Sequence, residues 1–589
     1  MLAKRVRIIS YFMLAIVLML IIKLYSVQII HYSDFADRAD RQYQRPSGTI
    51  FNRGTIYFTS KDGELISAAT LKTGFNVAIN PKLLQKSGAD GINLAFQKIS
   101  ALIPLDENDF LMRANKVNDS YEEIAKHLDE DTGTKIDALK ISGVSIYKEK
   151  WRYYPGGELA SNVLGFMGFK GDEYAGRYGL ERYYEDTLKR NSDDVYVNFF
   201  AEIFSNIHNA VDGTKMEGDI VTTIEPDTQK YLEDTLAGIQ KQYSAQMTGG
   251  IIMNPMNGQV YAMGKVPTFD PNNFSGVKDV GVFKNDLVES VYEMGSIIKP
   301  LTMSVGVDVG KVTASTTYND KGSVKIDDRT ISNFDKQGRG IITLMYAMAK
   351  SLNTGFIFIE QQVGNIIFGK YFESFGLGEK TGIDLPNEAS GLIDTLKHNR
   401  DVEFVTAAFG QGIAISPIET IRAEAAIANG GYLVTPHVVQ KIDYRIGIDK
   451  NVEPAKGNRV MKEDTALAVT RMLINNVDTS LLNGKSKNPR YSVAAKTGTA
   501  QISVKGSSGY SEDQYLHSFI GFFPAYNPKF IVFLYIVNPR GVNYASETLA
   551  KPFIDLTKYL INYYQIPPDR GVGDVVNETA STTNATSTH

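Results

Sequence analysis

The chain has 589 residues, of which 43% are hydrophobic and 22% are charged, and its formal net charge is −4 at pH 7. This length predicts two or three folded units, and the composition is that of a globular protein with substantial cores. The small negative charge, with no long basic block, argues against nucleic acid as a partner. Cysteine is absent, which excludes disulfides, thiolate nucleophiles and cysteine-ligated metals.

A long apolar run lies near the N-terminus. It extends over Ile8–Ile30, and only Lys23 interrupts it with a charge. As a helix it would be about 34 Å long, enough to cross a bilayer. Three basic residues precede it: Lys4, Arg5 and Arg7. The positive-inside bias therefore predicts a cytoplasmic N-terminus (1–7), a single-pass anchor in the cytoplasmic membrane (8–30) and an extracytoplasmic remainder. A cleaved signal peptide is the alternative, but the run ends in no small-residue cleavage site.

Residues 31–215 are predicted to form an elongated α+β module. Short β-rich runs (GTIYF, GFNVAI and GVSIY) occur among charged stretches. One of these stretches, NDSYEEIAKHLDEDTG at 118–133, is predicted to be helical. A new strand, GDIVTTIEP from Gly218, is followed by a helical pattern, so we expect the next domain to begin near residue 216.

Residues 216–568 alternate between helical and β-rich segments and are predicted to form a second, catalytic domain. Its first strands, in TGGIIMNPMNGQVYAMG, are predicted to pair as a hairpin that turns at Met256–Gly258. Residues 569–589 are rich in Ser, Thr and Asn, a composition typical of a disordered tail.

The chain has seven histidines, and no pair of them has metal-ligand spacing. None lies near a Gly-x-Ser-x-Gly turn, so neither a metal site nor a Ser-His-Asp triad is predicted, and no cofactor is expected. A hydroxyl nucleophile in this chain would need a different base, for which lysine is the candidate.

A serine followed three residues later by lysine occurs at Ser145–Lys148, Ser275–Lys278 and Ser296–Lys299. On a helix the two side chains share one face, and a desolvated lysine near a second cation can take the serine proton. The first pair lies in a strand-like run and the second in a loop-like stretch. Ser296 alone follows a glycine and opens a predicted helix, in which Pro300 fits only the first turn. The free N–H groups at that end can stabilise an oxyanion.

Lys-Thr-Gly also occurs three times, at 72–74, 380–382 and 496–498. The first lies in the N-terminal module and the second in a predicted turn. The third follows the apolar run YSVAA and is predicted to lie on a strand that continues into Thr499, where a strand edge can bind an extended peptide and its carboxylate. Ser351-Leu352-Asn353 ends a predicted helix between the motifs, where a hydroxyl could relay a proton and an amide could hold a substrate backbone.

In chain order, Ser296–Lys299, Ser351–Asn353 and Lys496-Thr497-Gly498 match the motif set of penicillin-binding proteins and serine β-lactamases. Further stretches extend the match: FDPNNF, TGIDLPNE, FGQGIAISPIE and HSFIGFFPA, with SGTIFNRG, RYYPGGELASNVLGF and GRYGLE in the N-terminal module. The chain therefore resembles a class B penicillin-binding protein from Met1 to about Pro568. Two residues depart from the family pattern: Asn52 replaces an aspartate and Met294 replaces a proline.

The resemblance implies a transpeptidase domain with an antiparallel sheet flanked by helices and an all-helical subdomain, preceded by a pedestal of the dimerisation type. It also implies peptidoglycan D,D-transpeptidase activity, in which Ser296 attacks the D-Ala-D-Ala end of a stem peptide and D-Ala leaves. By the same resemblance Lys299 is the base, Ser351 with Lys496 relays the proton, and Asn353 completes the catalytic set.

Further implied roles concern binding. The N–H groups of Ser296 and Thr499 would form the oxyanion hole, and Thr497, Gly498 and Thr499 would contact the substrate, the threonines its carboxylate. β-Lactams would be inhibitors that stall as acyl-enzymes. An FtsW/RodA-type membrane glycosyltransferase would be the partner, contacted through the anchor and the pedestal near three charged residues: Arg53, Arg152 and Glu181. The alternative for these residues is that they brace the pedestal internally.

Other functions have less support. A serine β-lactamase needs a deacylating base, and no Glu-x-x-Leu-Asn element lies between Ser351 and Lys496. A bifunctional class A penicillin-binding protein would need a glycosyltransferase domain before residue 218, in the region that the pedestal motifs occupy. A β-lactam sensor would need more cytoplasmic sequence, whereas a scaffold role could coexist with catalysis. The stretch YEMGSIIKP and the residues His517–Ile520 favour a division-type, FtsI-like role over an elongation-type role.

Overall fold

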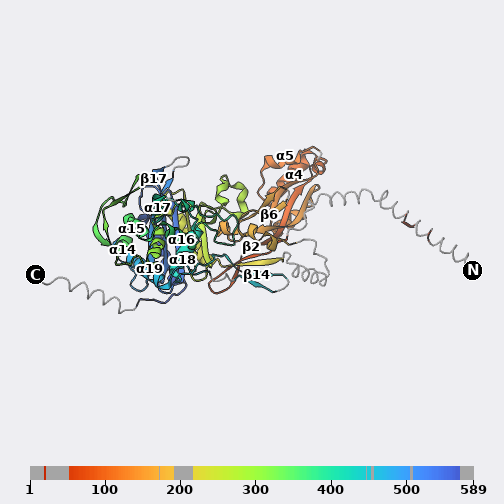
Figure 1. Cartoon of the computed structure of the whole chain (residues 1–589). Helices are drawn as coiled ribbons and strands as arrows, with labels where there is room; N and C mark the ends of the chain where they lie inside the picture. Colours follow the sequence, from red (N-terminus) through yellow and green to blue (C-terminus); the bar gives the residue numbers. More distant parts are fainter. Residues whose placement is uncertain are drawn as a thin grey trace, which may run out of the picture. The chain divides into compact units, whose positions relative to one another are not determined.

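The computed structural model describes residues 52–117, 119–171, 173–190, 216–398, 400–445, 448–452, 457–503 and 509–570, together with Met13, Met19 and Leu20. The chain divides into two compact units, each described separately below (Figure 1). The smaller holds Leu71–Arg152, with Met1–Arg53 and Asn191–Phe199 assigned to it; the larger holds Gly54–Thr70, Tyr153–Arg190 and the chain from Phe200. Almost all of the predicted anchor (8–30) and of the predicted tail lies outside the described residues. Among the helices formed by the described residues, none combines the length and apolar character that a membrane span requires.

The smaller unit packs four helices on strands. The helices are α3 (Pro81–Gln85), α4 (Gly88–Ser100), α5 (Glu107–Ala114) and α6 (Glu130–Ala138), and the strands are the second part of β2 (Leu65–Ile79), β3 (Glu122–Leu128) and β4 (Val144–Tyr153). Side-chain oxygens of Asn80, Asp106 and Asp129 accept backbone N–H groups and fix where α3, α5 and α6 begin. The α+β character predicted for this region is confirmed.

The helix predicted within 118–133 is wrong in its first part, because Glu122–Leu128 forms strand β3. This strand pairs antiparallel with β2, and the pairing places Leu128 opposite Phe75. Ile124 and Leu128 then pack against the core of the smaller unit. Tertiary packing thus overrides a helix-favouring composition, and only the residues after Asp129 are helical.

The N-terminal part of the larger unit is built on a sheet with the strand order β15-β14-β7-β1-β2. Its strands are β1 (Ile56–Thr59), the first part of β2, β7 (Gly218–Thr222), β14 (Val439–Tyr444) and β15 (Lys450–Asn451). β1 runs parallel to β7, and β14 runs antiparallel to β7. Beside this sheet lie short elements: α7 (Ser161–Leu164), α8 (Gly179–Tyr183), α9 (Glu185–Leu188) and the hairpin of β5 (Met167–Lys170) and β6 (Glu173–Gly176).

A five-stranded antiparallel sheet forms the centre of the larger unit, in the order β16-β17-β18-β8-β9. Its strands are β8 (Met247–Met253), β9 (Val260–Val266), β16 (Ala494–Ser503), β17 (Tyr510–Phe523) and β18 (Phe530–Val537). α11 (Pro226–Tyr243) and α21 (Ala550–Tyr563) pack on the sheet through one apolar cluster, which includes Leu232, Val532 and Phe553. The predicted hairpin is present as β8 and β9, and Gly258 adopts φ +84° in its turn.

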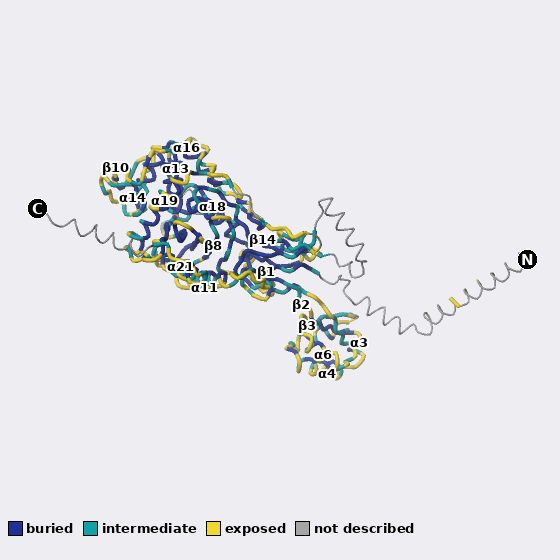
Figure 2. The backbone as a smooth tube through the Cα atoms, turned by 90° about the horizontal axis from the view of Figure 1, so that it is seen from below, coloured by how far each residue is buried: buried dark blue, intermediate teal, exposed yellow. Residues whose placement is uncertain are grey.

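A helical lobe accompanies this sheet (Figure 1). Its helices are α13 (Lys299–Asp308), α14 (Leu344–Ala349), α15 (Asn353–Val363), α16 (Asn365–Ser374), α17 (Asp401–Ala407), α18 (Pro417–Ala428) and α19 (Glu463–Asn475). Before α14, β10 (Thr317–Asp320) pairs antiparallel with β13 (Gly340–Thr343). The hairpin of β11 (Ser323–Ile326) and β12 (Arg329–Ser332) lies between these two strands in the chain. Figure 2 shows α13, α18 and β8 in the buried interior. The antiparallel sheet flanked by helices that was predicted for this domain is confirmed, whereas the predicted all-helical subdomain also carries the short strands β10–β13.

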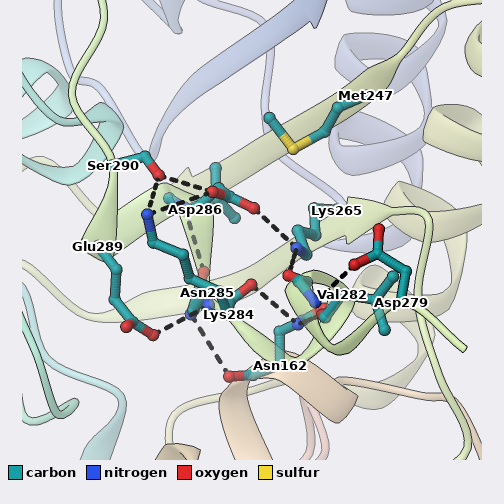
Figure 3. Close-up of polar contacts among 12 residues, drawn as sticks. Asn162, Met247, Lys265, Asp279, Val282, Lys284, Asn285, Asp286, Glu289 and Ser290 are labelled. Carbon is teal, nitrogen blue, oxygen red and sulfur yellow. Dashed lines mark hydrogen bonds and ion pairs between the residues drawn. The ribbon is translucent and has the colours of Figure 1, made fainter. Parts of the chain in front are cut away.

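A partly buried polar cluster fixes the short helix α12 (Asp286–Glu289), which precedes the predicted nucleophile (Figure 3). Lys265 donates to Asp286 Oδ2 at 2.7 Å and is only 3% exposed. Ser290 Oγ donates to the other carboxylate oxygen and accepts from Lys284 Nζ, both at 2.6 Å. Because breaking a buried ion pair is strongly destabilising, this cluster holds the chain firmly where it enters the next segment.

Candidate active site

Ser296 lies in the 3-10 helix η5 (Gly295–Ile298), which leads directly into α13. Pro300 lies in the first turn of α13, as the sequence predicts. The serine therefore precedes the α-helix by one tight turn instead of opening it. Gly295 adopts φ +65°, and a Cβ there would lie 2.8 Å from the carbonyl oxygen of Thr499. A glycine is required before Ser296 because this backbone passes so close to strand β16.

Lys299 is the first residue of α13 and is fully buried. Its Nζ donates to the carbonyl oxygen of Ser351 at 2.7 Å, to Ser351 Oγ at 3.2 Å and to Asn353 Oδ1 at 2.8 Å. The first and second predicted motifs therefore meet at this amine. As an ammonium group, Lys299 can donate to all three acceptors, which together fix its position.

Ser351 lies between α14 and α15 and adopts φ +55°, a left-handed conformation that is uncommon for a residue with a side chain. Lys496 Nζ, 2% exposed as a residue, donates to Ser351 Oγ at 2.9 Å and to the carbonyl oxygen of Thr497 at 2.9 Å. The hydroxyl of Ser351 is thus shared by two buried lysines, and the strained backbone delivers it between them.

The two lysines have perturbed pKa values. Burial lowers the pKa of Lys299 well below its usual value, and the positive charge of Lys496 lowers it further. Burial also lowers the pKa of Lys496 to about 7, but the nearby carboxyl of Glu424 opposes this shift. Lys299 therefore reaches the neutral state more easily than Lys496. A neutral amine at this position can act as a general base for a serine hydroxyl.

Asn353 begins α15 and has its side-chain amide oriented by two partners. Its Nδ2 donates to the carbonyl oxygen of Ser332 at 3.0 Å, while its Oδ1 faces Lys299. This arrangement ties Lys299 to strand β12. One N–H of the amide remains for another acceptor, such as the substrate backbone that the sequence-based interpretation assigns to it.

Lys496, Thr497, Gly498 and Thr499 lie on β16, as the sequence predicts. A Cβ on Gly498 would lie 2.3 Å from Ser518 Oγ and 2.6 Å from the carbonyl oxygen of Met294, so only glycine lets β16 pass beside the nucleophile segment. Thr497 and Thr499 are half-buried. Thr499 Oγ1 accepts the backbone N–H of Ala545 at 3.1 Å. A strand edge with these groups can hold an extended peptide.

Comparison with known families gives two matches. Residues 248–557 match the penicillin-binding protein transpeptidase domain, and residues 51–201 match the penicillin-binding protein dimerisation domain. The chain belongs to the class B penicillin-binding proteins.

Among relatives, the chain is 30% identical over 501 residues to stage V sporulation protein D of Bacillus subtilis. The aligned region covers 83% of this chain and 75% of that protein. It is 26% identical to the peptidoglycan D,D-transpeptidase MrdA of Acinetobacter baumannii, covering 90% and 84% of the two chains. Penicillin-binding protein 2X of Streptococcus thermophilus has the same fold, with a TM-score of 0.69 and 19% identity. The match covers 89% of this chain and 81% of that chain. Apo penicillin-binding protein 3 of Mycobacterium tuberculosis superposes with a TM-score of 0.63 and 25% identity, covering 71% and 92%.

The other copies of the tripeptide lie elsewhere in this class B penicillin-binding protein. Lys380-Thr381-Gly382 forms a turn in which the N–H and hydroxyl of Thr381 donate to one oxygen of Glu388, at 2.5 and 2.6 Å. The N–H of Gly382 donates to the other oxygen of Glu388 at 3.1 Å. This second copy therefore serves to build a turn, and the first copy, 72–74, lies within strand β2 of the smaller unit.

The other serine-lysine pairs lack the arrangement seen at Ser296. Ser145 and Lys148 lie in strand β4, which confirms the strand predicted there. Side chains alternate along a strand, so two residues three positions apart point to opposite faces. Ser275 lies in the last turn of a short 3-10 helix, η3 (Pro271–Gly276), and Lys278 follows the helix outside any helical element. Neither pair can place its serine and lysine on one helical face.

Three charged pedestal residues that the sequence suggested as a partner surface are buried: Arg53 is 2% exposed, Arg152 5% and Glu181 0%. Glu181 Oε1 accepts the hydroxyl of Tyr154 at 3.2 Å. These side chains are therefore not exposed for contact with a partner, and the predicted partner contact near them stays a prediction. The alternative, that they brace the fold internally, agrees with their burial.

Sequence reasoning missed Glu424 of α18. The residue is 2% exposed, and its Oε1 has no hydrogen-bond partner among the described residues. Its charge acts on Lys496, and burial raises the pKa of its carboxyl. A signal was present in the sequence, because PIETIRAEAAIA is otherwise made of small and apolar residues around this glutamate, apart from Glu419 in the first turn and Arg422.

Proposed function

We propose that this class B penicillin-binding protein cross-links peptidoglycan through an acyl-enzyme at Ser296, with Lys299 as the general base. The observation that carries the proposal is the pair of buried lysines that both donate to Ser351 Oγ. One of them, Lys299, follows Ser296 by one turn, and its lowered pKa favours the neutral amine that a general base requires.

In acylation, Lys299 Nζ takes the proton of Ser296, and Ser296 Oγ attacks the carbonyl carbon of the penultimate D-Ala. The N–H groups of Ser296 and Thr499 stabilise the oxyanion of the tetrahedral intermediate. When the peptide bond breaks, the proton passes from Lys299 through Ser351 Oγ, held by Lys496, to the departing amine of the terminal D-Ala. The hydrogen bonds among these three residues support this path.

In the second half-reaction, the amine of a neighbouring stem peptide attacks the ester carbonyl. Its proton returns through the same path, a new peptide bond forms and Ser296 regains its hydroxyl. A β-lactam acylates Ser296 in the same way, but its amine stays tethered and cannot leave, so the enzyme stalls. Structures of penicillin-binding protein 3 of Mycobacterium tuberculosis complexed with aztreonam and with ampicillin support inhibition of this kind.

Labelling of the full chain with fluorescent penicillin tests the nucleophile. Ser296→Ala should abolish labelling while the protein stays folded, and the labelled wild-type peptide should contain Ser296. Ser145→Ala and Ser275→Ala are matched controls, because each removes the serine of the same four-residue pattern. Covalent labelling that persists in Ser296→Ala would overturn the assignment.

The proposed setting is septal wall synthesis at the outer face of the cytoplasmic membrane, with Ile8–Ile30 as the anchor. The alternative is an elongation role, which similarity to MrdA supports. Depleting the protein in its own host separates the two. Filaments with unfinished septa would agree with division, whereas round cells would contradict it and favour elongation.

The proposed partner is an FtsW/RodA-type glycosyltransferase, which would supply nascent glycan strands. Because Arg53, Arg152 and Glu181 are buried, a mutation there would perturb folding instead of an interface. The sharper variant replaces Ile8–Ile30 by an unrelated spanning helix. Co-purification of the partner should weaken while labelling of Ser296 persists, and undiminished co-purification would contradict contact through the anchor.

A further inference from the structure

His517 lies directly across from Thr499 in the sheet, because β17 and β16 pair antiparallel in that register. The imidazole is fully buried, and its Nδ1 lies 3.0 Å from Thr548 Oγ1. Burial lowers the pKa of His517 to about 4, so the ring is neutral at physiological pH. A neutral, enclosed ring contributes to the site through its hydrogen bonds and not through charge.

The partner of His517, Thr548, ends the short helix α20 (Ala545–Thr548), and its residue is fully buried as well. Thr548 Oγ1 donates to the carbonyl oxygen of Ala545 at 3.3 Å. The N–H of the same Ala545 donates to Thr499 Oγ1 at 3.1 Å. These hydrogen bonds thus connect Thr499 through Ala545 and Thr548 to His517. His517 in turn pairs with Thr499 across the two strands.

The hydrogen bond from Ala545 restricts the hydroxyl of Thr499. A hydroxyl has one hydrogen to donate and two lone pairs to accept with. Because Thr499 Oγ1 already accepts from Ala545, one lone pair is occupied and the rotation of the O–H is restricted. The hydrogen is then free to be donated to an anionic acceptor in front of β16, which is the role that the proposed function gives this residue.

We propose that His517 is a positioning residue for recognition of the substrate's terminal carboxylate: it holds α20 so that Ala545 fixes the hydroxyl of Thr499. This inference rests on the proposed transpeptidase function and adds to it a residue that touches no substrate atom. His517 acts on the carboxylate only through Thr548, Ala545 and Thr499, so removing its hydrogen bond weakens recognition of that one group.

The test compares two thioester donors that mimic the stem-peptide end, one with a free terminal carboxylate and one with a terminal carboxamide. Thr548→Val keeps the shape of the side chain and removes the partner of His517. Its kcat/KM for the carboxylate donor should fall about tenfold, the effect of weakening one charge-assisted hydrogen bond. With the carboxamide donor the change should stay within about twofold, since that contact involves no anion.

Further variants sharpen the result. His517→Leu should reproduce the loss, and His517→Asn should restore most of the activity because an amide can occupy the position of Nδ1. Thr557→Val is the matched control: Thr557 is a buried threonine of α21 whose hydroxyl donates to the carbonyl oxygen of Phe553 at 2.8 Å. In a Thr499→Val background, Thr548→Val should have no additional effect.

Equal losses with both donors, or an equal loss in Thr557→Val, would overturn the positioning role and leave the transpeptidase function intact. A wild-type enzyme without Ser296-dependent turnover of the carboxylate donor would overturn the function and this inference together. If His517→Leu does not fold, the ratio of the two donors in Thr548→Val still decides the matter.

Discussion

Lys496 offers the most direct test of the chemistry, because alanine at this position removes one of the two lysines that share the Ser351 hydroxyl. The variant loses the donor to Ser351 Oγ and the donor to the carbonyl oxygen of Thr497, both at 2.9 Å. A positioned proton-transfer group contributes about 10²–10⁴-fold to a rate. We therefore expect the acylation rate constant of Lys496→Ala to fall about 10²–10⁴-fold.

The same change should shift the pH profile. Below about pH 7 Lys496 is increasingly protonated, and its charge lowers the pKa of Lys299 by repulsion. Without that charge the pKa of Lys299 rises, although burial, the larger cause, remains. The neutral amine then forms only at higher pH, so the acid limb of the acylation profile should move upward.

The assay is time-resolved acylation by fluorescent penicillin on both sides of pH 7. Lys380→Ala and Lys72→Ala are matched controls, because each removes the lysine of the same tripeptide from a turn or a strand without the Ser351 contact. Both should acylate within about twofold of wild type, as surface changes usually do. Comparable losses at all three lysines, or an unmoved acid limb in Lys496→Ala, would refute the reasoning.

Three further variants test neighbouring parts of the site. Ser351→Ala removes the hydroxyl shared by the lysines and should slow acylation by about 10²-fold or more, measured by the same assay in a protein with unchanged circular dichroism. Gly498→Ala would place a Cβ 2.6 Å from the carbonyl oxygen of Met294, so calorimetry should report a destabilisation of about 1–3 kcal/mol. Glu424→Gln removes the negative charge that raises the pKa of Lys496, so that pKa should fall below about 7; an upward shift of the corresponding limb of the pH profile would contradict the direction.

Sequence context was sufficient to choose among repeated motifs. Pro300 restricts Ser296 to the start of a helical segment, and the apolar run before Lys496 predicts a strand. Both inferences use local physics, and the structure agrees with both. Turn residues around the tripeptide at 380–382 distinguished it in the sequence from the one at 496–498. In the structure the carboxylate of Glu388 holds that turn by accepting hydrogen bonds from Thr381.

Features that depend on distant contacts were not predictable in this way. Glu122–Leu128 has a helix-favouring composition, but pairing with β2 makes it a strand. The left-handed backbone of Ser351 could not be predicted from the sequence, because the lysines that hold its hydroxyl come from two distant segments. Glu424 was missed for the same reason: its effect on Lys496 exists only after α18 is buried beside the sheet.

An asymmetry between the two lysines favours Lys299 as the proposed base. Two ammonium groups sharing one buried hydroxyl repel each other, and desolvation penalises both, so one of them must give up its proton. At Lys299, burial and the charge of Lys496 act in the same direction and both lower the pKa. At Lys496, Glu424 opposes the effect of burial. The proton therefore stays preferentially on Lys496, which leaves Lys299, one turn from Ser296, as the neutral amine that can accept the nucleophile's proton.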